Sequence, residues 1–193
     1  MRISRSGDLT RCEVLVGFAD RYWKWYLSRA LVEPSEGKPD GMQLENLLRR
    51  DRVLVLDSCA DRGELFERLV ETAGDVGPGR DALVRSLVSR EEAGPTSTPE
   101  GVAFPHALMG DIEETALVVA LVRGGIDFGN REHPLCDVVF CLFGDPSKPW
   151  EHVQLLARLA RVSHGPGAIE RFRACGDAGA LYDAVVEEDR SHV

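Results

Sequence analysis

The stretch that decides the fold is residues 81–122, DALVRSLVSREEAGPTSTPEGVAFPHALMGDIEETALVVALV. From Asp81 to Glu92 the apolar side chains recur at helical spacing, and Gly94 then supplies a typical helix C-cap. After a turn rich in Pro, Ser and Thr, the apolar residues form short unbroken runs at 102–104 and 116–122, as in buried strands. The stretch therefore predicts a helix followed by two strands.

The same alternation extends on both sides of this stretch. Before it, the pattern predicts a short helix at 44–48, a buried strand at 53–56, and a helix through 65–70 that closes at Gly74. After it, the pattern predicts a strand at 135–143 and helices at 150–162, 168–174 and 179–187. Strands that alternate with helices indicate an α/β fold, in which α-helices sandwich a mixed and mostly buried β-sheet.

The first part of the chain differs in composition from the rest. It contains an aromatic cluster in a predicted helix that ends near Val32, made up of Tyr22, Trp23, Trp25 and Tyr26. Residues 33–41 are rich in Pro and Gly, as linkers are. We therefore expect a helical N-terminal extension and linker at 1–41 and the main domain at 42–193. Such a helix can lie on a membrane, although packing against its own domain or a second subunit is the simpler interpretation.

Charge and hydropathy limit the function classes. The chain has 32 acidic and 23 basic side chains among 193 residues, a formal charge of -9. This charge disfavours binding to nucleic acid or anionic lipid. No apolar run approaches the roughly 20 residues that cross a bilayer, and the N-terminus lacks the apolar region of a signal peptide. We expect a cytoplasmic protein with no membrane insertion, whose partners are proteins or small molecules.

Cysteine usage supports the same compartment. The five Cys are scattered and include no CxxC pair. An odd, unpaired set argues for reduced thiols that pack in the core, as free Cys usually does.

The segment with the clearest chemical signal is Glu100 to Ala107, EGVAFPHA. Pro105 fixes its own backbone angle and holds Phe104 extended, so His106 emerges at a rigid strand end. That geometry suits an imidazole presented to an incoming partner. A lone His is nevertheless more often structural, and this alternative stays open on residue types alone.

Two further segments bear on His106. His152 falls in the first turn of a helix with Pro149 near its start. A helix N-terminus disfavours protonation of a nearby imidazole, so His152 can act as a neutral hydrogen-bond donor. Arg90 lies at the end of the helix that precedes the His106 strand, where a salt bridge to Glu91 or its neighbour is the alternative role.

With these segments in view, the chain resembles the enzyme IIA domain of the bacterial phosphoenolpyruvate-dependent phosphotransferase system, of the fructose, mannitol and nitrogen-regulatory type. The resemblance runs from about Leu44 to Val186. Residues 101–107, GVAFPHA, resemble the family's active-site strand with its phosphorylated histidine. The other similar segments are 152–161 with the second active-site histidine, 89–91 with the site arginine, and the loop GIDFG at 125–129.

The resemblance implies a role for each matching residue. His106 would accept the phosphoryl group, His152 would be its hydrogen-bonding neighbour, and Arg90 would clamp the phosphate. The partners implied are an HPr-like phosphocarrier and a IIB-type domain or regulatory target. The protein would be a phosphotransferase component, a protein-histidine phosphocarrier that needs no cofactor and no metal.

Some alternatives remain open at this stage. The hydroxyls of Thr96, Ser97 and Thr98 are candidates for phosphate contacts, although ordinary turn residues have the same composition. A non-catalytic module that keeps the fold and binds a regulator is the rival function. No IIB-like or membrane region accompanies the domain in this sequence, which favours a regulatory role over sugar transport.

Overall fold

A computed structural model describes residues 43–130 and 135–192. The predicted extension at 1–41 and its boundary with the main domain lie outside these residues. The five strands are β1 (Leu48–Leu56), β2 (Val102–Ala103), β3 (His106–Leu108), β4 (Ala116–Ile126) and β5 (Cys136–Gly144). The helices are the 3-10 turn η1 (Leu44–Asn46), α2 (Arg62–Ala73), α3 (Arg80–Glu92), α4 (Pro149–His164), α5 (Ala168–Arg173) and α6 (Ala178–Ser191).

The strands form one mixed sheet. Its order is β1-β4-β5-β2, and β3 also pairs with β5. β1 is parallel to β4, β4 is antiparallel to β5, and both β2 and β3 are parallel to β5. The prediction of a mixed sheet is therefore confirmed.

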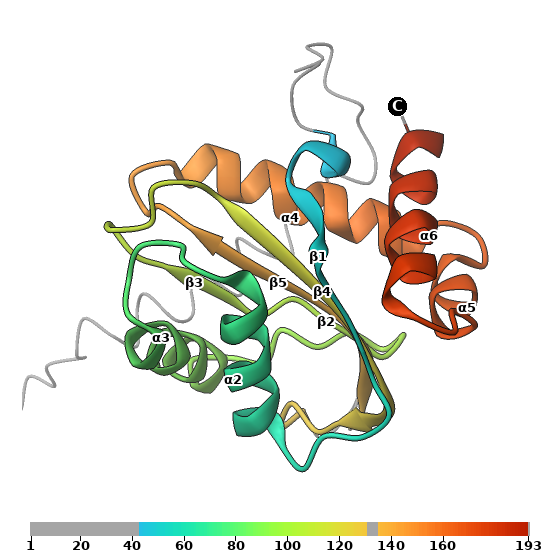
Figure 1. The fold of residues 1–193 in the computed structure, drawn as a ribbon, viewed down its shortest axis with the longest axis horizontal. Helices are drawn as coiled ribbons and strands as arrows, with labels where there is room; N and C mark the ends of the chain where they lie inside the picture. The colour runs from blue at the N-terminus through green and yellow to red at the C-terminus, as the bar shows by residue number, and fades with distance from the viewer. Residues whose placement is uncertain (1–42, 131–134, 193) are drawn as a thin grey trace, which may run out of the picture. The chain divides into compact units, whose positions relative to one another are not determined.

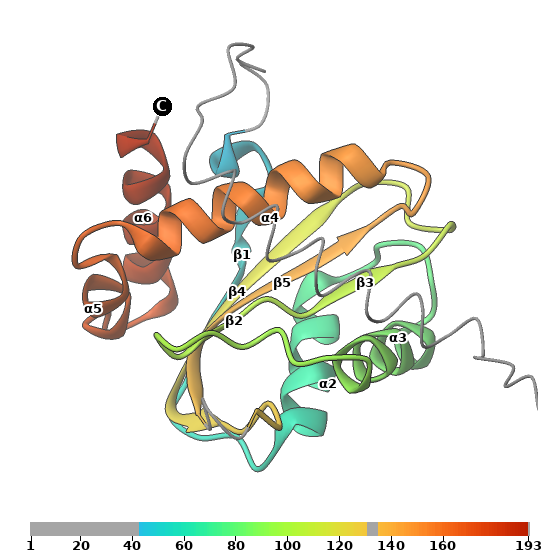
Figure 2. The same ribbon diagram turned by 180° about the vertical axis from the view of Figure 1, so that it is seen from behind.

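Helices cover both faces of this sheet, as predicted (Figures 1 and 2). α2 and α3 lie on one face, where Leu69 and Leu87 join Val139 and Cys141 of β5 in one buried cluster. α4 crosses the opposite face (Figure 2), and α5 on that side places Phe172 against Phe140, with ring centroids 6.3 Å apart. The alternation of β5 side chains thus divides the core between the two helical layers.

The structure differs from the sequence-based prediction at the start of the sheet. The helix expected at 44–48 is only the turn η1, and Leu48 already belongs to β1. Three Arg and an Asp fill residues 49–52 of β1, where the side chains are exposed or half-buried, and the pairing with β4 shifts register between Leu48 and Val53. A charged, irregular edge strand hides the alternation by which strands are predicted.

Buried cysteines contribute to the core. Cys136, Cys141 and Cys175 are buried, as predicted for free Cys, and Cys59 is half-buried. Among residues 43–130 and 135–192, no helix combines the length and the apolar character that crossing a membrane requires.

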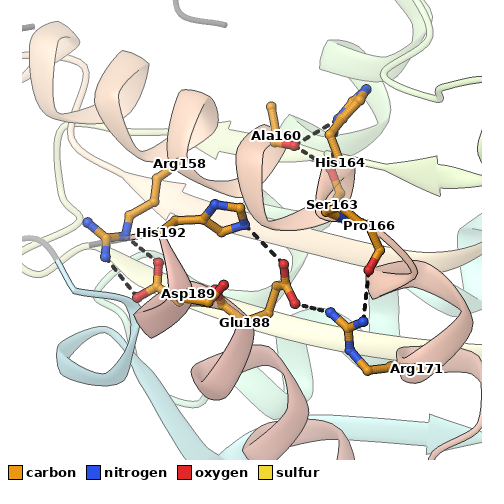
Figure 3. A network of polar contacts seen from close by, with 10 residues as sticks. Arg158, Ala160, Ser163, His164, Pro166, Arg171, Glu188, Asp189 and His192 are labelled. Atoms are coloured by element: carbon orange, nitrogen blue, oxygen red, sulfur yellow. Dashed lines mark hydrogen bonds and ion pairs between the residues drawn. The ribbon is translucent and has the colours of Figure 1, made fainter. Parts of the chain in front are cut away.

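A polar network joins the helices at the end of the sheet where α5 and α6 lie (Figure 3). Asp189 is only 1% exposed, and it accepts hydrogen bonds from the Arg158 side chain and from the backbone N–H of Leu44. Glu188 contacts Arg171 and His192. Buried carboxylates need such partners, so this network ties α4, α5 and η1 to α6.

Candidate functional site

A break in the strand next to β5 places His106. β2 and β3 both pair with β5, but Phe104 and Pro105 separate them. Proline has no N–H to donate to a ladder, although the Pro105 carbonyl still accepts from Leu142 N at 3.0 Å. The chain resumes pairing at His106, opposite Leu142, and leaves the imidazole half-buried at the sheet edge.

The left-handed backbone of Gly101 starts this segment. Its φ is +82°, and its carbonyl accepts from the backbone N–H groups of Asp137 and Val138. Arg173 bonds both the Asp137 carboxylate and the Glu100 carbonyl, at 2.6 to 2.9 Å. The backbone at the start of the His106 segment is therefore fixed by hydrogen bonds from β5 and from α5.

The hydrogen-bond partners of the His106 ring assign its tautomer. Nδ1 lies 3.0 Å from the Phe104 carbonyl oxygen, which can only accept, so Nδ1 carries the hydrogen. Arg90 Nε donates to Nε2 at 2.8 Å, so Nε2 presents its lone pair. Burial lowers the pKa of His106 to about 3, and the positive charge of Arg90, with that of His152 when it is protonated, adds to the effect. The ring is therefore uncharged at neutral pH.

Arg90 reaches this ring from the last turn of α3. Its Nη1 donates to the Gly94 carbonyl at 2.9 Å, which fixes the guanidinium over the turn that follows the helix. The sequence left open a salt bridge with an adjacent Glu, but the hydrogen bonds of Arg90 go to His106 and Gly94.

His152 reaches the site from the opposite helical layer. It lies in the first turn of α4, and its ring centroid is 4.7 Å from that of His106, at an interplanar angle of 56°. Burial lowers the pKa of His152 to about 4, and the nearby charge of Arg90 adds to this. His152 is therefore also neutral, and one of its ring nitrogens is a donor.

The structure thus brings together three residues that are far apart in the sequence. α3, β3 and the start of α4 meet at one end of the sheet, away from α5 and α6 (Figure 1). A guanidinium and a second imidazole flank an uncharged, half-buried imidazole whose lone pair is on Nε2. Such a constellation can bind and transfer a phosphoryl group.

The three hydroxyl residues of the turn have different surroundings. Thr96 is bonded to Glu91, through its backbone N at 2.7 Å and its Oγ1 at 2.8 Å. Ser97 Oγ and Thr98 Oγ1 are buried and have no hydrogen-bond partner. Their predicted role as phosphate ligands remains a prediction.

Glu91 was missed as a site residue by the sequence reasoning. Its side chain is 2% exposed, although it follows Arg90 at the end of a surface helix. No signal in the sequence indicated this burial, because a glutamate at a helix end is usually exposed. In the described part of the chain, no group of three His, Cys, Asp or Glu side chains is arranged to hold a metal ion.

Comparison with known proteins identifies the family. The family model described as "Phosphoenolpyruvate-dependent sugar phosphotransferase system, EIIA 2" matches residues 46–188. The chain therefore belongs to the EIIA type 2 family of that system, whose members are phosphotransfer components.

Individual relatives agree with this assignment. A nitrogen regulatory protein of Bradyrhizobium diazoefficiens is 26% identical over 75% of this chain and 95% of its own length. The crystal structure of the nitrogen regulatory protein IIA-Ntr from Neisseria meningitidis matches with a TM-score of 0.69 at 17% identity, over 75% of this chain and 99% of that one. The IIA mannitol enzyme in its complex with phosphorylated IIB mannitol from Escherichia coli matches with a TM-score of 0.63 at 19% identity, over 72% and 97%. The two structural matches establish the fold.

Proposed function

We propose that this protein accepts a phosphoryl group on Nε2 of His106 from the phosphohistidine of an HPr-like carrier. It then passes the group to a IIB-type protein or keeps it as a regulatory signal. The observation that carries the proposal is the surroundings of the uncharged His106 ring. Arg90 Nε lies 2.8 Å from Nε2, and the His152 ring centroid lies 4.7 Å from that of His106.

The transfer step follows from the tautomer. The Nε2 lone pair attacks phosphorus in line with the donor's P–N bond, which breaks as the new N–P bond forms. The electron pair of the broken bond returns to the donor's imidazole. The His106 ring gains positive charge, and the Phe104 carbonyl stabilises that charge by accepting from Nδ1–H at 3.0 Å.

Arg90 and His152 balance the charge of the transferred group. Arg90 must give up its bond to Nε2 as phosphorus approaches, and its N–H donors then face the phosphoryl oxygens. A guanidinium fork suits these oxygens well. His152, neutral at pH 7, supplies a second donor from the other side. The unpartnered hydroxyls of Ser97 and Thr98 are further candidate donors.

The relatives suggest two destinations for the group. Proteins named for nitrogen regulation match this chain, which favours a role as a signal. The Escherichia coli relative forms a complex with phosphorylated IIB mannitol, which supports a IIB-type partner. Adding purified IIB-type domains to the phosphorylated protein separates these roles, because a carrier is discharged and a signal persists.

The test of phosphoryl acceptance is intact-mass measurement after incubation with phosphoenolpyruvate, enzyme I and an HPr-like protein. We expect the wild type to gain one phosphate and His106→Ala to gain none. His152→Ala should still react, but more slowly, because it loses a donor and keeps the nucleophile. If the wild type gains no mass while it binds a regulatory partner, the protein is an interaction module.

A further inference from the structure

Glu91 is a buried carboxylate with no role in the transfer step described above. It is 2% exposed at the end of α3, directly after Arg90. Burial raises the pKa of this carboxyl group, which opposes its ionisation. A buried acid is costly unless its oxygens are bonded, so the bonds that Glu91 makes indicate what it does.

Both carboxylate oxygens of Glu91 accept hydrogen bonds from Thr96. Oε1 accepts from Thr96 N at 2.7 Å, and Oε2 accepts from Thr96 Oγ1 at 2.8 Å. The carboxylate therefore fixes the turn after α3 at one point, by two charge-assisted hydrogen bonds.

Thr96 passes this constraint to the His106 ring. Its carbonyl accepts from Phe104 N at 3.3 Å, and the Phe104 carbonyl accepts from His106 Nδ1 at 3.0 Å. A chain of hydrogen bonds thus runs from the Glu91 carboxylate to one ring nitrogen. The adjacent residue, Arg90, donates to the other ring nitrogen at 2.8 Å.

We propose that Glu91 is a positioning residue for phosphoryl acceptance, which through Thr96 and the Phe104 carbonyl keeps the His106 hydrogen on Nδ1 and the lone pair on Nε2. This inference rests on the proposed function. If the Phe104 carbonyl moves away, the hydrogen can shift to Nε2, and the nitrogen that faces Arg90 then has no lone pair for phosphorus.

The direct test is the nitrogen-15 NMR spectrum of the His106 imidazole in the unphosphorylated protein, recorded for wild type, Glu91→Ala and Glu91→Gln. The wild type should show hydrogen on Nδ1 alone. Glu91→Ala should show a mixture of both tautomers and a roughly tenfold slower phosphoryl acceptance, as small misplacements of a reacting group cause. Glu91→Gln should restore both values, because its amide oxygen accepts from Thr96 N and its amide N–H donates to Thr96 Oγ1.

Two further variants test whether a change in the His106 spectrum could come from general unfolding. Thr96→Val removes one of the two bonds and keeps the shape of the side chain, so it should give a smaller tautomer shift in a folded protein. Glu188→Ala removes another buried carboxylate, 6% exposed, from the network at the α5 and α6 end (Figure 3). It should lower stability without changing the His106 spectrum.

Two results would overturn the inference. The first is a folded Glu91→Ala or Thr96→Val protein that keeps the wild-type His106 spectrum. The second is a Glu91→Gln protein that is as impaired as Glu91→Ala, which would mean that the charge acts and not the chain of hydrogen bonds. The spectrum needs no phosphate donor. If the wild type fails to accept phosphate, the proposed function fails, and the spectrum still tests whether Glu91 fixes the His106 tautomer.

Discussion

Among single residues, phosphoryl acceptance as proposed requires two imidazoles that stay uncharged. His106 and His152 have pKa values lowered to about 3 and about 4, mainly by burial. An ordinary imidazole with a pKa near 6.5 would be about one quarter charged at pH 7 and mostly charged at pH 5. The folded protein therefore keeps His106, the proposed nucleophile, uncharged at pH values where a free histidine is protonated.

The same values predict how stability depends on pH. As pH falls below about 6.5, the unfolded chain takes up protons on these two residues, while the folded protein does so only near pH 4 and 3. The free energy of unfolding should therefore decrease between pH 6.5 and pH 4. Urea unfolding at pH 7.5 and pH 5 should show a smaller decrease in the double variant His106→Gln, His152→Gln. An equal decrease in both proteins would show that neither ring has a lowered pKa.

Arg90 offers a second prediction at this scale. Arg90→Ala should slow phosphoryl acceptance by about 10- to 100-fold, because charge-assisted hydrogen bonds to a phosphoryl group contribute about 1.5–3 kcal/mol. Arg90→Lys should recover only part of the rate, since an ammonium cannot donate as a planar fork. The rate is measured by the rise of phosphorylated protein in intact-mass spectra.

Arg85 provides the control for Arg90, because it lies exposed on the same helix. Arg85→Ala should react at the wild-type rate. An Arg85→Ala protein as slow as Arg90→Ala would mean that the loss reflects the total charge of α3 and not a contact with the phosphoryl group.

At the scale of elements, the break between β2 and β3 is what exposes His106. Gly101 begins this segment with a φ of +82°, and a Cβ there would lie 2.8 Å from Arg173 Nη2. We expect Gly101→Ala to lower the free energy of unfolding by about 1–2 kcal/mol from backbone strain, and further by displacing Arg173 from its bonds to Glu100 and Asp137. Thermal unfolding measures the loss.

Gly74 is the control position for the Gly101→Ala prediction. Its φ is +75°, and a Cβ there would meet no atom within 4 Å. Gly74→Ala should therefore show the backbone strain alone and lose less stability than Gly101→Ala. Equal losses would indicate that the Arg173 contact does not stabilise the turn.

Some of the strands could be predicted from the sequence and others could not. The apolar run before Pro105 predicted β2, and the Pro correctly marked where the chain leaves it. The prediction missed β3, because a three-residue strand after a proline has too few side chains to show alternation. The charged part of β1 was missed for a similar reason, since its exposed edge position permits Arg and Asp.

The candidate site was likewise predicted in part from the sequence and missed in part. Residue types and flanking residues made His106, His152 and Arg90 candidates, and the family resemblance gave them roles. Their distances depend on how α3 and α4 pack on opposite faces of the sheet. The burial of Glu91 was not predictable, because a glutamate at a helix end is usually exposed. The hydroxyl of Thr96 made it a candidate for phosphate contacts or an ordinary turn residue, and its bonds to Glu91 were not predicted because no periodic pattern links a helix end to a turn.

In the whole domain, the proposed site and the buried carboxylates of α6 lie apart. The proposed site lies where α3, β3 and the start of α4 meet, and the carboxylates lie at the other end of α4 (Figures 1 and 3). Changes in the second region should alter unfolding and leave phosphoryl acceptance intact.

Asp189 tests this separation. Asp189→Ala should cost about 3–5 kcal/mol, because it leaves the Arg158 charge without its partner in a largely buried setting and frees the backbone N–H of Leu44. The exposed pair of Arg50 with Asp183 is the comparison, and Asp183→Ala should cost about 0–1 kcal/mol. Both proteins, once folded, should accept phosphate at the wild-type rate. A slower rate in folded Asp189→Ala would contradict the separation.

Nitrogen-15 and phosphorus-31 NMR of the phosphorylated protein show which atom of His106 attacks phosphorus. We expect one phosphorus bonded to Nε2 of His106, with the hydrogen remaining on Nδ1 beside the Phe104 carbonyl. Phosphorus on Nδ1 of His106, or on any other residue, would contradict this expectation.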